Sequence, residues 1–341
     1  TLFRSNTVLM TKNHKKPAAE ATAHPHIERN PGVPFDAAWF EALRVNRSAV
    51  ERRAASLSGR RTVKKEWQAA WLLKAITCMD LTTLAGDDTE GNVLRLCAKA
   101  KAPVRQDLLE ALGMGGEGIQ TGAVCVYHNL IPYAKAALDG SGIPIAAVST
   151  GFPAGKITLE DKLTEIEKSV AAGATEIDIV ISRDLVLQGK WRELYDEVAA
   201  CRKACGEAHL KTILATGEIP TYTLVAKAGM VSMMAGSDFI KTSTGKESVN
   251  ATLPVSLVMI RMIRDYHERT GFKVGFKPAG GIQKAKQALD WLILMKEELG
   301  NEWLRPELFR FGASSLLGDI ERQLEHHVTG RYSAAFRHPM A

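Results

Sequence analysis

Two lysines lie in short apolar segments that have the composition of β-strands. Lys241 lies in FIKTSTGK at residues 239–246, and Lys277 lies in GFKPAGG at residues 275–281. A charged amine is expensive to bury in such a segment. If the two strands are neighbours, the ammonium groups face each other, and both like charge and desolvation favour an uncharged amine.

An uncharged lysine near pH 7 is a nucleophile that forms a Schiff base with a carbonyl group. Lowering a lysine pKa from about 10.4 to about 7 takes roughly 4 kcal/mol, which a buried like charge and desolvation together can supply. The alternative is that both lysines extend along the strand ends to solvent. Because both also lie beside glycine-rich turns, we favour the chemical interpretation.

A carboxylate in a third strand-like segment is the candidate proton carrier. Asp178 lies in EIDIVI at residues 176–181, where it needs a charged partner. The lysine pair could be that partner, and Asp178 would then act as a general acid and base beside a Schiff base. The alternative is a structural salt bridge. Asp80 precedes LTTL and is a similar candidate, although it could instead cap the following turn.

Glycine clusters after three successive strands predict a phosphate site. Backbone N–H groups in such turns and at helix N-termini bind anions, although ordinary turns also use glycine for its flexibility. The segment at 244–246 is not a nucleotide P-loop, because Ile240 and Glu247 stand where that motif needs glycine and Ser/Thr. The candidate phosphate ligands are Gly245, Lys246, Gly280, Gly281, Ser314 and Ser315.

Short apolar segments alternate with amphipathic ones along most of the chain. We expect eight strands at 75–81, 123–127, 145–150, 176–181, 210–216, 238–243, 273–277 and 309–311, and helices that include 159–172, 193–208, 220–235 and 255–270. Eight such units in about 250 residues predict an α/β fold of the (β/α)8 (TIM) barrel class, whose reactive residues gather at the carboxyl ends of the strands. An open doubly wound sheet is the alternative, although no G-x-G-x-x-G follows a strand.

The positive charge of the chain is concentrated near its start. The formal net charge is +6, and residues 1–19 contain four basic residues and no acid, which leaves +2 for the rest. We therefore expect a disordered basic tail over residues 1–35, followed by an N-terminal helical extension at 36–74, the barrel at 75–330 and a C-terminal tail at 331–341. A nucleic-acid-binding scaffold that uses the basic tail is an alternative function, but the nearly neutral body argues against it.

The cysteines and the hydropathy suggest a compartment. Five cysteines without a paired framework indicate a reduced, intracellular protein. No apolar segment approaches the roughly 18 residues that span a bilayer. We expect a cytoplasmic protein with a small-molecule substrate and with neither a membrane nor a nucleic-acid partner.

Several of these motifs, in this order, resemble the deoxyribose-phosphate aldolases over residues 65–330. They are DLTTL at 80–84, GFPAG at 151–155, EID at 176–178, FIKTSTGK at 239–246, VNAT at 249–252, GFKPAGG at 275–281 and FGASS at 311–315. The resemblance implies reversible cleavage of 2-deoxy-D-ribose 5-phosphate to acetaldehyde and D-glyceraldehyde 3-phosphate in deoxynucleoside catabolism. Another lysine Schiff-base aldolase, or a transaldolase acting on a different phosphorylated sugar, is the alternative.

The resemblance also implies roles for single residues. Lys241 would form the Schiff base, Lys277 would depress its pKa, and Asp178 would relay protons through a water molecule. We also expect Asp80 and Cys125 to contact the substrate. The chemistry needs neither a metal nor a cofactor, and a homo-oligomer is one option for the assembly.

The chain departs from the aldolase pattern at three places. His128 follows Tyr127 where bacterial relatives often have proline, so the loop there is expected to be reshaped. Ala215 stands where some relatives have glutamate, so we expect no acid at that position of the fifth strand. Some relatives end in a flexible tyrosine that assists proton transfer. Tyr332 is the nearest candidate here, and we do not assign it that role.

Overall fold

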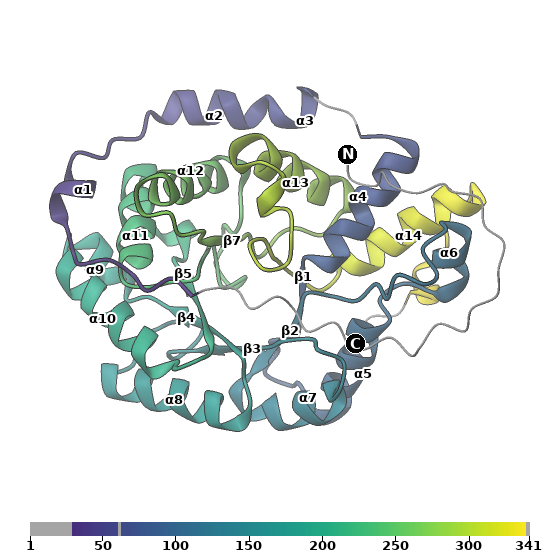
Figure 1. The fold of residues 1–341 in the computed structure, drawn as a ribbon, viewed down its shortest axis with the longest axis horizontal. Coiled ribbons are helices and arrows are strands. Elements are labelled where there is room, and N and C mark those ends of the chain that lie inside the picture. Colours follow the sequence, from purple (N-terminus) through teal and green to yellow (C-terminus); the bar gives the residue numbers. More distant parts are fainter. Residues whose placement is uncertain (1–28, 61–62, 339–341) are drawn as a thin grey trace.

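The computed structural model describes residues 29–60 and 63–338, and eight parallel strands form its centre (Figure 1). The strands are β1 (Met79–Thr82), β2 (Ala123–Tyr127), β3 (Ile145–Ser149), β4 (Glu176–Val180), β5 (His209–Ile213), β6 (Phe239–Lys241), β7 (Gly275–Lys277) and β8 (Phe311–Ala313). Their order in the sheet is β7-β6-β5-β4-β3-β2-β1-β8. The predicted barrel is confirmed. The open doubly wound sheet is excluded because strands β1 to β7 follow one another in sequence order, β8 pairs with β1, and bridges join the β7 and β8 segments.

Contacts between β7 and β8 bring the two ends of the sheet together. Phe276 forms an isolated parallel bridge with Phe309, and Ala279 forms another with Gly312. The Phe276 N–H also donates to the Leu308 carbonyl at 2.9 Å. Side chains from all eight strands can therefore meet at one axis, as they do in a (β/α)8 barrel.

Helices surround the strands (Figure 1). They are α5 (Glu90–Lys101), α6 (Gln106–Ala111), α7 (Ile131–Leu138), α8 (Leu159–Ala172), α9 (Arg183–Leu187), α10 (Trp191–Ala204), α11 (Tyr222–Met234), α12 (Leu253–Thr270), α13 (Ala285–Leu299) and α14 (Leu316–Thr329), with short 3-10 turns at His128–Leu130, Thr216–Glu218, Asn301–Trp303 and Ala335–Arg337. The boundaries of α12 follow from its sequence: the Thr252 side chain caps its first turn, and Gly271 ends it in the left-handed conformation at φ 80°.

Four helices precede the first strand, namely α1 (Ala37–Glu41), α2 (Arg47–Ala55), α3 (Leu57–Arg60) and α4 (Lys65–Thr77). Arg53 of α2 forms ion pairs with Glu297 and Glu298 of α13 at 2.6 and 3.1 Å, so α2 lies on the outside of the helical ring (Figure 1). Most of the predicted tail lies outside the described residues. Within it, however, Asn30 is buried, and its side chain donates to two backbone carbonyls at 2.8 and 2.9 Å.

The largest difference from the expected elements lies at the first strand. Residues 75–81 were expected to be extended, but α4 continues to Thr77 and β1 begins at Met79. Ala75, Ile76 and Leu81 are all fully buried. One apolar segment therefore serves both the end of a buried helix and the following strand, and hydrophobicity alone does not separate the two. Among the described residues, no helix is both long and apolar enough to cross a membrane.

Candidate active site

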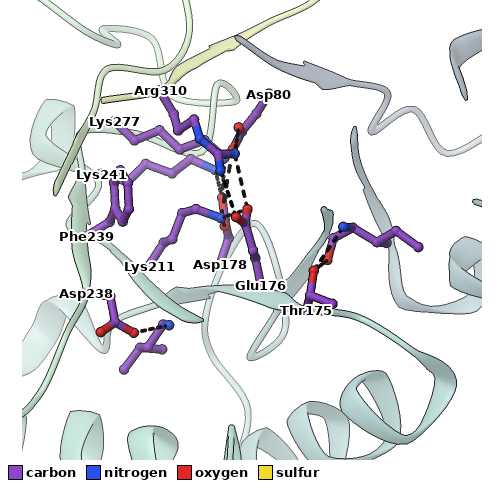
Figure 2. A network of polar contacts seen from close by, with 12 residues as sticks. Asp80, Thr175, Glu176, Asp178, Lys211, Asp238, Phe239, Lys241, Lys277 and Arg310 are labelled. Carbon is purple, nitrogen blue, oxygen red and sulfur yellow. Dashed lines mark hydrogen bonds and ion pairs between the residues drawn. The ribbon is translucent and has the colours of Figure 1, made fainter. Parts of the chain in front are cut away.

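Ion pairs connect seven charged side chains inside the barrel, which we call the barrel cluster (Figure 2). Its members are Asp80, Glu176, Asp178, Lys211, Lys241, Lys277 and Arg310. Each is at most 4% exposed. They come from β1, β4, β5, β6, β7 and the residue before β8, and the closed sheet brings them together. Buried charges of this kind require close partners of opposite sign, and every member has at least one.

Asp178 lies between the two lysines that the sequence singled out. Its Oδ2 accepts hydrogen bonds from Lys241 Nζ at 2.8 Å and from Lys277 Nζ at 2.7 Å. Its Oδ1 accepts a longer bond of 3.3 Å from Lys211 Nζ. The structure therefore brings together the three predicted catalytic residues and adds a third lysine.

The pKa values of the two central lysines move in opposite directions. Burial lowers the pKa of Lys241, the Lys277 ammonium lowers it further, and Asp178 opposes this only in part. Burial would also lower the pKa of Lys277, but the Asp178 and Asp80 carboxylates outweigh it and raise that pKa above its usual value. Burial would raise the pKa of Asp178, yet Lys241, Lys277 and Lys211 hold it well below its usual range. The pair thus consists of one lysine whose pKa is lowered and one whose pKa is raised.

Three members of the cluster, Glu176, Lys211 and Arg310, were not predicted from the sequence to have a role. Arg310 donates to Asp80 Oδ1 at 2.5 Å and to Glu176 Oε1 at 2.9 Å, and Lys211 pairs closely with Glu176. Asp80 Oδ2 lies 2.5 Å from Lys277 Nζ. A signal for Lys211 was present, because it is a charged residue in an apolar strand, as Lys241 is. Arg310 had the same signal, because it lies between Phe309 and Phe311 in the predicted strand at 309–311, although β8 itself begins at Phe311.

A cavity of about 250 Å³ opens above Lys241. Lys241 lines it together with the loops that follow β6, β7 and β8. All six predicted phosphate ligands are on its wall, namely Gly245, Lys246, Gly280, Gly281, Ser314 and Ser315. The cavity thus combines a buried amine, which can react with a carbonyl group, with polar turns that can bind an anion.

Glu247 organises the loop after β6 and was not predicted to have this role. Its carboxylate accepts hydrogen bonds from the Thr244 N–H at 3.0 Å, the Gly245 N–H at 3.1 Å and the Thr244 hydroxyl at 2.8 Å. These two amides are therefore bonded within the loop. The Lys246 N–H is likewise bonded, to Thr244 Oγ1 at 3.1 Å, but the Lys246 side chain is exposed and can meet an anion at this strand end.

The two other predicted substrate contacts lie elsewhere. Asp80 is fully buried in the barrel cluster, and Cys125 packs in a small apolar group with Ala146 and Val148. Neither is among the residues that line the cavity. Burial raises the pKa of the Cys125 thiol, so it remains protonated. Tyr332 is exposed and stacks on His326 at a ring distance of 4.1 Å, and it does not line the cavity either.

The arrangement fits a lysine that attacks a carbonyl group. The amine is buried, has a lowered pKa, contacts a carboxylate and lines a cavity together with glycine and serine turns that suit an anion. A family model for the DeoC/LacD family aldolases matches residues 74–317, which include the whole barrel cluster and the cavity. The chain belongs to this aldolase family.

Mammalian relatives support the assignment to the aldolase family. The human protein named deoxyribose-phosphate aldolase is 62% identical over 314 residues, which are 92% of this chain and 99% of the human one. The mouse protein of the same name is 63% identical over 312 residues, which are 91% and 98% of the two chains. In fold, this aldolase is similar to the tetrameric deoxyribose phosphate aldolase of Aeropyrum pernix, with a TM-score of 0.54, 21% identity and coverage of 82% of this chain and 99% of the other.

Proposed function

We propose that this chain cleaves 2-deoxy-D-ribose 5-phosphate reversibly to D-glyceraldehyde 3-phosphate and acetaldehyde through a Schiff base on Lys241. The observation that supports this most directly is the position of Lys241. Among the described residues of the barrel cluster, it is the lysine that also lines the cavity. The named human relative, at 62% identity over nearly its whole length, supports the choice of substrate.

In the first step, uncharged Lys241 attacks the aldehyde carbon of the open-chain sugar, and loss of water gives an iminium ion. The iminium accepts the electron pair of the C2–C3 bond as that bond breaks. The 3-hydroxyl loses its proton to Asp178 through a water molecule, so its oxygen becomes the aldehyde of glyceraldehyde 3-phosphate. The remaining enamine is protonated at carbon and hydrolysed to acetaldehyde, which frees the lysine.

Lys277 and Asp178 support this sequence in different ways. Lys277 stays charged between two carboxylates, and its field favours the uncharged form of Lys241. Asp178 contacts the reacting amine and stays ionised, so it can take a proton when the 3-hydroxyl must give one up.

The phosphate would occupy the polar wall of the cavity. The exposed side chain of Lys246, together with the glycine and serine turns after β7 and β8, would bind it. Because these contacts are remote from the bond that breaks, they orient the sugar over Lys241.

A trapping experiment tests the proposal. Purified protein is incubated with acetaldehyde, reduced with borohydride, digested and analysed by mass spectrometry. We expect a two-carbon adduct on Lys241, and the same adduct together with that of the whole sugar when deoxyribose 5-phosphate replaces acetaldehyde. Lys241→Leu should lose the adduct and the activity, whereas Lys168→Leu, on the exposed face of α8, should retain both. Adducts confined to surface lysines in active protein would contradict the Schiff-base assignment.

We also propose a role in deoxynucleoside breakdown, a cytoplasmic location and self-association. The five cysteines are unpaired and buried, which is typical of a reducing compartment. The Aeropyrum pernix aldolase is tetrameric, and sedimentation of the purified chain would reveal whether it also assembles. The division into a tail, a helical extension over 36–74 and a barrel is likewise a proposal, which limited proteolysis can test.

A further inference from the structure

The charges of the barrel cluster balance only when one of its basic side chains is uncharged. The cluster contains three carboxylates and four basic groups. Lys277 contacts two carboxylates, Asp80 and Asp178. Lys211 also contacts at least two of the carboxylates. Lys241 pairs with Asp178 alone among the described residues.

Arg310 has two partners as well, and it lies with Glu176 at the far end of the cluster. Both side chains line a second cavity of about 490 Å³, together with His209, Phe239 and Arg29. Neither lines the cavity above Lys241, so neither can touch a substrate there. Both nonetheless connect to the reacting amine. Arg310 binds Asp80 Oδ1 at 2.5 Å and Asp80 Oδ2 binds Lys277, while Glu176 pairs with Lys211.

We propose that Arg310 and Glu176 are positioning residues for the aldolase reaction, which hold Asp80 and Lys211 in place and set the charge balance that leaves Lys241 as the uncharged amine. The inference rests on the proposed function, because it assigns these residues a role in preparing the Schiff-base lysine. They act through intermediaries and not by contact with substrate. The ion-pair geometry and the count of charges both support this role.

The effect of each charge follows from electrostatics in a buried site. Charges inside a protein are poorly screened, so one charge removed at the far end changes the proton affinity of the amine. Without Arg310 the cluster has an excess negative charge, which favours protonated Lys241. Without Glu176 it has an excess positive charge, which favours the uncharged amine. The charged or titratable groups that act on Lys241 or on Arg310 and Glu176 include Asp80, Cys78, Cys125, Asp178, His209, Lys211 and Lys277.

Three variants test the proposal, namely Arg310→Gln, Glu176→Gln and the double variant. The readouts are the pH dependence of borohydride trapping at Lys241 and of kcat/KM. We expect the alkaline rise of Arg310→Gln to move up by about one pH unit and that of Glu176→Gln to move down by a similar amount. The double variant restores the charge balance, so its profile should return toward that of the wild type. Loss of packing alone would not shift the two single variants in opposite directions.

The outcomes separate this inference from the proposed function. Wild-type protein that is never trapped at Lys241 would overturn the proposed function, and this inference with it. Trapping at Lys241 with the same pH profile in the wild type and in all folded variants would overturn this inference alone. If Arg310→Gln does not fold, as judged by circular dichroism, the pH profiles of Glu176→Gln and of the double variant still test the proposal. A Glu176→Gln profile that moves up or stays in place contradicts the proposal.

Discussion

Lys241 and Lys277 lie directly opposite each other in the β6–β7 register. Both donate to the same oxygen of Asp178, at 2.8 and 2.7 Å. Two amines in nearly equivalent backbone positions nevertheless have pKa values displaced in opposite directions. The difference comes from Asp80, which contacts Lys277 and not Lys241.

The charge of Lys277 can be removed with Lys277→Leu. The pKa of Lys241 should then rise, because a neighbouring positive charge no longer disfavours its protonated form. Since the uncharged amine is the nucleophile, the rise of kcat/KM with pH should move to higher pH. A shift of one to two pKa units would lower the rate at pH 7 by about 10- to 100-fold. Lys277→Arg keeps the charge and is the matched control. An unchanged profile with a full rate in Lys277→Leu would refute this role.

Asp178→Asn separates formation of the Schiff base from turnover. Removing the carboxylate takes away a group that raises the pKa of Lys241, so the amine should remain uncharged and reactive. The proton carrier is lost, however, and turnover should fall by about 10²- to 10⁴-fold. We therefore expect borohydride trapping with acetaldehyde to persist while cleavage of deoxyribose 5-phosphate nearly stops. If folded Asp178→Asn loses trapping as well as turnover, then Asp178 is needed to form the Schiff base and the prediction is wrong.

The sequence predicted most of the fold because buried parallel strands are apolar and regularly spaced. The segments 123–127 and 159–172 match β2 and α8 in both boundaries. The first strand was displaced because Ala75 and Ile76 are as buried in a helix end as they would be in a strand. The last strand was placed two residues early, since Phe309 joins the sheet through an isolated bridge before β8 begins.

For the site, the residues alone pointed to the two lysines and the glycine turns, but only the resemblance gave Lys241 and Lys277 different roles. The strand register decides which carboxylate contacts which lysine, and this register cannot be derived from the composition of the segments. The role of Glu247 depends on its hydrogen bond with Thr244, three residues earlier in the chain, and this contact likewise becomes visible only in the structure.

Lys246→Met tests the anion wall of the cavity. A charged hydrogen bond contributes about 1.5–3 kcal/mol, so its loss should raise the KM for deoxyribose 5-phosphate by about 10- to 100-fold. The KM for unphosphorylated 2-deoxyribose should change little, because that sugar has no group to meet Lys246. Parallel kinetics with both sugars give the comparison. An equal increase in KM for both sugars would show that the substitution disturbs the loop as a whole and that Lys246 does not bind the phosphate specifically.

Gly280 and Gly281 form a matched pair for the turn after β7. Both adopt left-handed backbone conformations, at φ 79° and 80°, which cost any other residue about 1–3 kcal/mol. A Cβ on Gly281 would meet nothing within 4 Å, whereas a Cβ on Gly280 would lie 2.7 Å from three side-chain atoms of Asn250. Asn250 in turn donates to the Glu247 carbonyl at 3.0 Å, so the clash reaches the loop after β6.

We therefore expect Gly281→Ala to lower the melting temperature modestly and Gly280→Ala to lower it more. Gly280→Ala should also raise the KM for deoxyribose 5-phosphate, because moving Asn250 disturbs the loop that presents Lys246. Thermal melts and steady-state kinetics on the two variants check both points. Since φ is nearly the same at both positions, an excess effect at Gly280 reports the contact with Asn250. Equal effects of the two substitutions would mean that backbone conformation alone dictates glycine at this turn.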